Sequence, residues 1–149
     1  MKTIVVVDDS SFCRELLALA LRKSGYEVVT CPVGLDAMPL MLRDKPDLVL
    51  LDLRLPDMDG LKTLRIIRSS PSLKDVPVFI LSEEEHRACI VQATQIGIQA
   101  YILKSQFVLD KFLQRVQSQI GVGVVHRPMM APATSPTSAA IAEIWGQIE

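Results

Sequence analysis

Short apolar runs alternate along the chain with longer segments whose apolar residues recur every three or four positions. The first run, residues 4–7, is continuous and β-branched, which is typical of a strand buried on both faces of a sheet. Four more runs of similar length predict strands at residues 26–30, 48–51, 78–81 and 101–103. The pattern therefore predicts five short strands, each followed by a segment long enough for a helix.

The intervening segments have the period of amphipathic helices, with apolar residues on one face. In the first of them Ser10 or Ser11 can cap the helix, and Gly25 ends it after a basic last turn. The other helices are expected at about residues 35–43, 60–68, 84–96 and 107–120. Pro39 lies within the second helix and is expected to kink or shorten it, because proline has no backbone N–H to donate.

The alternation of strands and helices predicts an α/β fold, a doubly wound parallel sheet with helices on both faces. Such an open sheet binds its ligand at the carboxyl ends of its strands, where the strand order reverses. The residues that directly follow the predicted strands are therefore the first candidates for function.

Polar residues follow four of the five predicted strands. Asp8 and Asp9 come after the first strand, Asp52 after the third, Ser82 after the fourth and Lys104 after the fifth. Three carboxylates, a hydroxyl and an ammonium group thus converge on one edge of the sheet. Carboxylates this close repel one another, so the cluster is costly unless a cation binds there.

Oxygen ligands of this kind favour Mg²⁺, and the lack of Cys and His at these strand ends argues against zinc. Mg²⁺ holds a phosphoryl group and neutralises its charge, so that a neighbouring carboxylate can act as the nucleophile. Lys104 and Ser82 can bind the remaining phosphoryl oxygens, one by charge and one by a hydrogen bond. The residues alone therefore point to phosphoryl transfer onto an aspartate.

The composition narrows the class of protein. Of the 149 residues, 49% are hydrophobic, enough for a packed core, and the formal net charge of −1 indicates neither nucleic acid nor a membrane surface as a partner. No apolar run is long enough to span a membrane, and the N-terminal run is too short for a signal peptide. The three cysteines have no CxxC spacing, which is expected of reduced thiols in a cytoplasmic protein.

Three segments resemble a response-regulator receiver domain of two-component signalling, of the chemotaxis-regulator type. Residues 4–10 (IVVVDDS) are similar to the opening of the family, residues 50–60 (LLDLRLPDMDG) to its phosphoacceptor loop, and residues 100–104 (AYILK) to its fifth strand. The resemblance covers roughly residues 2–120, in order and with the family's spacing. It implies a flavodoxin-like (βα)5 fold with the strand order 2-1-3-4-5.

The resemblance also implies a role for each residue of the site. Asp52 is the phosphoacceptor and, with Asp9 and the backbone carbonyl of Arg54, a direct ligand of Mg²⁺. Asp8 acts on the ion through a water molecule. Lys104 is the cation that binds the phosphoryl group.

Two further residues are implied to carry the signal. Ser82 is the switch hydroxyl, which moves toward the phosphoryl group, and Tyr101 is the switch aromatic, which then turns inward. The change biases a two-state equilibrium at the surface of the fourth helix, fifth strand and fifth helix. From the residues alone, Ser82 can also be a helix cap and Tyr101 a core residue.

The implied function is a phosphorylation-controlled switch. A sensor histidine kinase or a phosphotransfer protein supplies the phosphoryl group, and an unidentified downstream protein reads the altered surface. The chain is then no enzyme in the ordinary sense, because it catalyses only its own phosphorylation and dephosphorylation. A hydrolase of the haloacid-dehalogenase type is disfavoured, since it needs a second acid two residues after the nucleophile, where Arg54 lies.

Two residues depart from the family pattern. Ser105 lies where the family usually has a cis proline, and a cis bond before a non-proline residue costs about 3 kcal/mol, so a trans loop of different shape is expected. Glu83 lies where the family prefers a small residue, and we expect it to restrain phosphoryl chemistry unless it only solvates a helix N-terminus. Both departures favour the alternative of a phosphorylation-independent interaction module.

The composition changes after the last predicted helix. Residues 1–121 are expected to form the receiver domain, and residues 122–149 a linker rich in Pro, Ala, Ser and Thr that leads to a short helix. One face of that helix carries the apolar residues Ile141, Ile144, Trp145 and Ile148. So short a helix is marginal in water, so we expect it to dock on a receiver surface, in its own chain or in a homodimer, or to stay disordered.

Overall fold

The computed structural model describes residues 1–55 and 58–123. Within these residues five parallel strands form one sheet in the order β2-β1-β3-β4-β5, which confirms the predicted strand order. The strands are β1 (Thr3–Val7), β2 (Glu27–Cys31), β3 (Leu48–Leu51), β4 (Val78–Ser82) and β5 (Ala100–Leu103). Val5 of β1 pairs with Val29 of β2 and with Val49 of β3, so the first strand of the chain lies inside the sheet.

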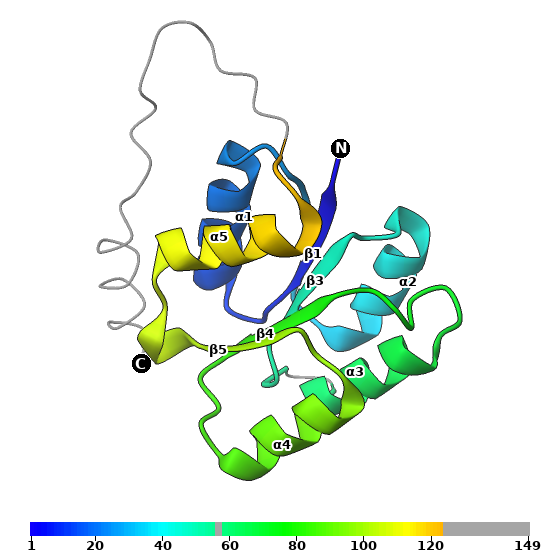
Figure 1. Ribbon diagram of the computed structural model, residues 1–149. Coiled ribbons are helices and arrows are strands. Elements are labelled where there is room, and N and C mark those ends of the chain that lie inside the picture. Colours follow the sequence, from blue (N-terminus) through cyan, green and yellow to red (C-terminus); the bar gives the residue numbers. More distant parts are fainter. Residues whose placement is uncertain (56–57, 124–149) are drawn as a thin grey trace, which may run out of the picture.

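In the described part of the chain, five α-helices cover the two faces of the sheet (Figure 1). They are α1 (Ser11–Lys23), α2 (Gly34–Asp44), α3 (Gly60–Ser69), α4 (Arg87–Ile96) and α5 (Leu109–Ile120). Helices α1 and α5 lie on one face, and α2, α3 and α4 on the other. The predicted doubly wound α/β architecture is therefore confirmed.

Alternate residues of the strands supply two apolar cores. Ile4 and Val6 of β1 belong to the cluster packed under α1 and α5, whereas Val5 and Val7 belong to the cluster under α2, α3 and α4. All four are at most 1% exposed. Burial of apolar surface contributes about 25 cal/mol per Å², so both cores hold the central strands, and the residues that follow them, in place.

Helix α1 begins and ends as the sequence predicts. The Ser10 hydroxyl accepts a hydrogen bond from the backbone N–H of Cys13 (3.4 Å). Gly25 follows the helix with a φ of +92°, a conformation that favours glycine. The helix therefore starts directly after the acidic pair that follows β1.

Pro39 does not shorten α2, so the expected shortening is wrong, whereas a kink at Pro39 stays a prediction. The helix runs from Gly34 to Asp44 with Pro39 inside it. Ala37 and Met41 are 0% exposed, whereas Pro39 is exposed. Packing of the buried face stabilises the helix, and the proline ring lies on the solvent side.

Two helices begin later than predicted. Helix α4 starts at Arg87 instead of residue 84, and α5 starts at Leu109 instead of residue 107. A 3-10 turn, Lys104–Gln106, comes between β5 and α5. The described residues contain no cis peptide bond, so the bond between Lys104 and Ser105 is trans, as expected from the missing proline.

The predicted C-terminal helix lies outside the described residues, as does nearly all of the predicted linker. None of the helices in the described ranges is long and apolar enough to cross a membrane.

Candidate functional site

The carboxyl ends of the central strands carry the acidic residues. Asp8 directly follows β1, and its backbone N–H donates to the carbonyl of Cys31 at the end of β2 (3.1 Å). Asp52 follows β3, and its backbone N–H donates to the carbonyl of Val7 at the end of β1 (2.9 Å). The hydrogen bonding of the sheet therefore continues past each strand and holds the two aspartates on neighbouring strand ends.

Lys104 follows β5 and joins these two aspartates. Its Nζ lies 2.8 Å from Oδ2 of Asp8 and 3.2 Å from Oδ2 of Asp52. Lys104 is 7% exposed, Asp8 2% and Asp52 5%. Because an unpaired charge is costly at a buried position, the Lys104 ammonium group needs at least one of these carboxylates as a partner.

Asp9 completes the acidic cluster. Carboxylate oxygens of Asp8, Asp9 and Asp52 lie within 4.8 Å of one another, and Asp9 is exposed. Oδ1 of Asp8 accepts from the backbone N–H of Ser10 (2.9 Å). Oδ1 of Asp52 accepts from the backbone N–H of Arg54 (3.0 Å). Three carboxylates against one ammonium group leave an excess of negative charge, and such a set of oxygen donors fits a divalent cation that keeps several waters.

Burial and charge shift the titration of Asp8 and Lys104. Burial, with a smaller contribution from the charge of Asp52, raises the pKa of Asp8 to about 6, although the charge of Lys104 opposes the shift. Burial alone would lower the pKa of Lys104, but the charges of the two aspartates outweigh it and hold this pKa above its usual range. Lys104 is therefore charged at neutral pH, and ionisation of Asp8 is costly, a cost that a bound cation would offset.

Comparison with known proteins decides the family. The family model of the response regulator receiver domain matches residues 4–117. The chain belongs to this family. Polar-differentiation response regulator DivK of Brucella anthropi is 28% identical to this receiver domain over 120 residues, which cover 80% of this chain and 97% of DivK.

Solved structures of other response regulators are similar to this receiver domain. The phosphorylated cyanobacterial phytochrome response regulator RcpA is 35% identical, with a TM-score of 0.68 over 78% of this chain and 89% of RcpA. The Mn²⁺-bound form of response regulator Rcp1 is 29% identical, with a TM-score of 0.71 over 86% of this chain and 99% of Rcp1. The fold and the family are thus supported by both sequence and structure.

The two candidate switch residues of the receiver domain hold the same loop. Ser82, the last residue of β4, is 0% exposed, and its hydroxyl accepts from the backbone N–H of Glu84 (3.2 Å). Tyr101 of β5 is half-buried, and its hydroxyl donates to the backbone carbonyl of Glu84 (2.6 Å). Burial raises the pKa of Tyr101 to about 12, so this hydroxyl stays protonated and able to donate.

Glu84 is a residue of this region that sequence reasoning missed. Its carboxylate accepts from the backbone N–H of His86 (3.1 Å) and pairs with Arg54 (3.4 Å). The hydrogen bond from His86 lowers the pKa of Glu84, and Arg54 adds to the effect. Because Ser82 and Tyr101 already bind its backbone groups, Glu84 lies in a loop and α4 begins only at Arg87. No local pattern signals such contacts.

Gly60, at the start of α3, closes the loop that follows Asp52. Its backbone N–H donates to the carbonyl of Leu53 (3.0 Å). A Cβ at this position would overlap Cα of Leu53 and lie 2.6 Å from the carbonyl oxygen of Asp52. Only glycine permits so close an approach of the loop to the backbone that carries Asp52.

The two departures from the family pattern lie in neighbouring loops. The Ser105 hydroxyl donates to the carboxylate of Glu85 (3.3 Å), so the loop after β5 is joined to the loop after β4. Glu83 is half-buried between Ser82 and Glu84 in the second of these loops. Its effect on phosphoryl chemistry stays a prediction.

The variant Asp8→Asn is expected to be more stable than wild type at pH 7 in metal-free buffer, by about 1–3 kcal/mol. The folded-state pKa of Asp8 is raised from 3.8 to about 6. The stability that this group contributes is therefore present below pH 4 and is lost as the pH rises through 6. Asn is neutral at every pH and escapes this loss, and its side-chain oxygen can still accept from Ser10. Urea unfolding at pH 7 and pH 4.5, with a chelator, measures the difference.

The matched control is Asp9→Asn, which removes a charge from the exposed member of the same cluster. Its stability is expected to change by less than about 1 kcal/mol, since exposed charges interact weakly. The gain from Asp8→Asn should narrow at pH 4.5. An Asp8→Asn variant that is less stable than wild type at pH 7 would contradict the expectation.

Proposed function

We propose that this receiver domain is a phosphorylation-controlled switch that accepts a phosphoryl group on Asp52 with Mg²⁺ bound at the acidic cluster. The observation that carries the proposal is the position of Lys104 between Asp8 and Asp52, with the Asp9 carboxylate within 4.8 Å of both aspartates. Membership of the response regulator receiver family supports the same chemistry.

Asp52 is the proposed nucleophile. An oxygen of its carboxylate forms a bond to phosphorus while the bond from phosphorus to an imidazole nitrogen of the donor breaks; the imidazole keeps the electron pair and takes up a proton. Lys104, 3.2 Å from this carboxylate, then binds a phosphoryl oxygen. Attack of water on phosphorus later returns the free carboxylate and inorganic phosphate.

Asp9, Asp52 and the backbone carbonyl of Arg54 are the proposed direct ligands of Mg²⁺, and Asp8 would act through a water molecule. The fit rests on the donor set, since the three carboxylates lie within 4.8 Å of one another and Asp8 is costly to ionise. When bound, Mg²⁺ neutralises charge on the phosphoryl oxygens. The Mn²⁺-bound structure of Rcp1 is in line with a hard cation that prefers oxygen ligands.

Ser82 and Tyr101 are proposed to carry the signal away from the site. The Ser82 hydroxyl binds the N–H of Glu84, so a move of this hydroxyl toward the phosphoryl group releases the loop before α4. Tyr101 binds the carbonyl of the same residue and responds to the new loop position. The affected surface is that of α4, β5 and α5, which is where a downstream protein would read the change.

The proposed donor is a phosphohistidine of a sensor histidine kinase or of a phosphotransfer protein, and the proposed target is an unidentified protein. The donor protein and the target protein are both proposed to be cytoplasmic, like the receiver domain itself. The domain would catalyse only its own phosphorylation and dephosphorylation. The relatives are in line with this proposal, since DivK is named a response regulator and the RcpA structure is of a phosphorylated protein.

The test is phosphorylation by a small-molecule phosphodonor, followed by intact mass. Wild type is expected to gain one phosphoryl group per chain with Mg²⁺ and none with a chelator. Asp9→Asn should need far more Mg²⁺ for the same rate, because a carboxylate ligand is lost. The control Asp36→Asn, which removes an exposed acid from the first turn of α2, should behave like wild type.

A wild-type protein that gains no phosphoryl group at any Mg²⁺ concentration would overturn the proposal. It would favour the second candidate, a receiver-like module that binds its partner without phosphorylation. The observation behind that candidate is that Tyr101 already holds the loop before α4 through Glu84. If wild type is phosphorylated and Asp9→Asn needs no more Mg²⁺ than wild type, only the proposed set of Mg²⁺ ligands is excluded.

The variant Glu83→Ala is expected to be phosphorylated faster than wild type, by a few-fold. Glu83 is half-buried next to Ser82, and its negative charge opposes the approach of a phosphoryl group. Time courses of mass gain and of its decay measure both directions, with Glu85→Ala as the control, because Glu85 is exposed and two residues further away. Equal rates for wild type and Glu83→Ala would show that Glu83 does not restrain the site.

A further inference from the structure

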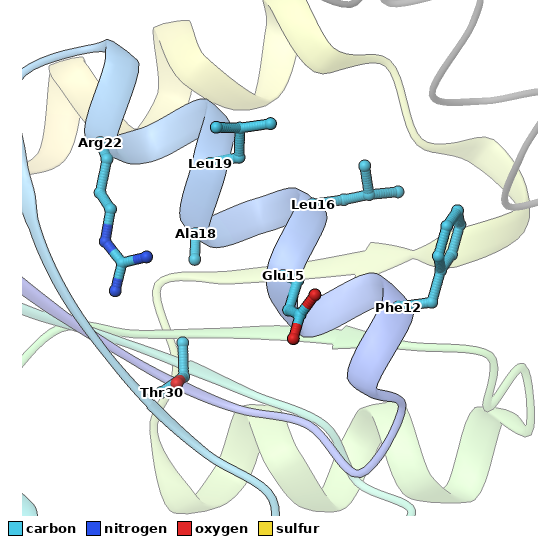
Figure 2. Close-up of a pocket in the computed structure, with 7 residues that line it drawn as sticks. All are labelled: Phe12, Glu15, Leu16, Ala18, Leu19, Arg22 and Thr30. Atoms are coloured by element: carbon cyan, nitrogen blue, oxygen red, sulfur yellow. The ribbon is translucent and has the colours of Figure 1, made fainter.

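Helix α1 carries an apolar face that is largely uncovered in the described structure. Phe12 and Leu19 are 45% and 44% exposed, and Leu16 between them is half-buried. The three residues are spaced by four and then three positions, so they share one face of the helix. In Figure 2 their side chains point away from Thr30 of β2, whereas Ala18 points toward that strand.

This face borders a groove of about 500 Å³. Glu15 and Arg22 of α1 line the groove together with Thr30 and the apolar residues (Figure 2). An apolar stripe beside charged side chains fits an amphipathic helix, which buries one narrow face and leaves its polar face in water.

The described chain ends beside the C-terminal end of α1. The Tyr26 hydroxyl donates to the carbonyl of Gly121 (2.6 Å), which ties the end of α5 to the start of β2. Gly123 approaches Ser24 and Gly25 so closely that a Cβ on Gly123 would overlap their backbone. Because these two residues directly follow α1, the chain from residue 124 onward starts next to this helix.

The length of the remaining chain suits this helix. Helix α1 has 13 residues and is therefore about 20 Å long. Residues 124–138 span at most roughly 50 Å when extended, which exceeds the length of α1. Residues 139–149 can therefore be placed at any point along α1.

The residue spacing and the charge of the C-terminal segment match those of α1. Ile141, Trp145 and Ile148 are separated by four and then three positions, the same intervals as those between Phe12, Leu16 and Leu19. Residues 139–149 contain two acidic residues and no basic one, whereas α1 contains three basic residues and one acidic residue. Opposite net charge favours their association.

We propose that residues 139–149 form a helix that packs along α1 of the same chain, with its apolar face on Phe12, Leu16 and Leu19. The apolar residues Leu35 and Leu42 are exposed on α2, but α2 covers the opposite face of the sheet from the point where the chain leaves α5. The proposal does not depend on phosphorylation.

Trp145 is the only tryptophan, so its fluorescence reports on this segment alone. In the full chain its emission is expected to be blue-shifted from that of solvated indole and protected from a soluble quencher. Phe12→Ser and Leu19→Ser should each shift the emission toward solvated indole and raise the quenching. Leu35→Ser on α2 is the matched control and should leave both quantities at the wild-type value.

Circular dichroism checks that the variants fold, which is expected because Phe12 and Leu19 are nearly half exposed in the described structure. Dilution with sedimentation separates docking in the same chain from docking on a second copy. Emission of a solvated indole in wild type, or a blue shift that Phe12→Ser and Leu19→Ser both leave unchanged, would overturn the proposal. A blue shift that disappears together with a dimer on dilution would also overturn it, in favour of a second copy.

Discussion

Replacing Asp52 by Asn is expected to abolish the phosphoryl adduct that we expect wild type to gain from a phosphodonor in the presence of Mg²⁺. An amide is a far poorer nucleophile than a carboxylate and carries no charge for a cation. The side-chain oxygen of Asn can still accept from the backbone N–H of Arg54, which Oδ1 of Asp52 does at 3.0 Å. The loop therefore keeps its anchor while the chemistry is lost, and intact mass measures the result.

Reduction of the acyl phosphate with borohydride, followed by peptide mapping, tests the position of the adduct. In wild type the reduced residue is expected at position 52. Asp59→Asn is the matched control, because Asp59 caps α3 in the same loop but lies outside the acidic cluster. An Asp52→Asn protein that gains the adduct as fully as wild type would refute Asp52 as the acceptor.

Gly60→Ala is expected to destabilise the protein by about 2–4 kcal/mol. The added Cβ would meet the backbone of Asp52 and Leu53, which are both buried and cannot move aside as a flexible side chain can. The loop must therefore shift, and the backbone of Asp52 and Leu53 must shift with it. Urea unfolding gives the loss of stability, and the phosphorylation rate gives the loss of function.

Gly34→Ala is the control for this substitution. A Cβ on Gly34 would come closest to the side-chain hydroxyl of Thr63, at 2.8 Å, and its three nearest neighbours are all side-chain atoms, unlike the backbone atoms that face Gly60. Gly34 also begins α2, where alanine has the higher helix propensity. A loss of stability in Gly34→Ala as large as that in Gly60→Ala would contradict the argument that a backbone contact is decisive.

The acidic cluster could be predicted because the ends of the strands are marked in the sequence. Apolar runs stop at Asp8 and Asp52, and parallel strands bring such ends to one edge of the sheet. The sequence also places Lys104 at that edge. It does not reveal that Nζ lies between the two aspartates, because this depends on how a long side chain is packed and buried.

The start of α4 and the continuity of α2 could not be predicted, because distant contacts decide both. Glu84 looks like the first turn of a helix, but Tyr101 binds its carbonyl from another strand. Pro39 looks like a break, but the buried side chains of Ala37 and Met41 hold the helix around it. In both places tertiary packing overrides a local preference.

Asp8, Asp52 and Lys104 follow the first, third and fifth strands, so the site is built from both ends and the middle of the fold. Contacts between residues so far apart in the chain are costly to form, because closing long loops loses entropy before any contact compensates it. Until β5 has joined β4, the two aspartates lack their ammonium partner. A chain still on the ribosome, whose fifth strand and Lys104 have not yet been made, therefore carries only part of the site.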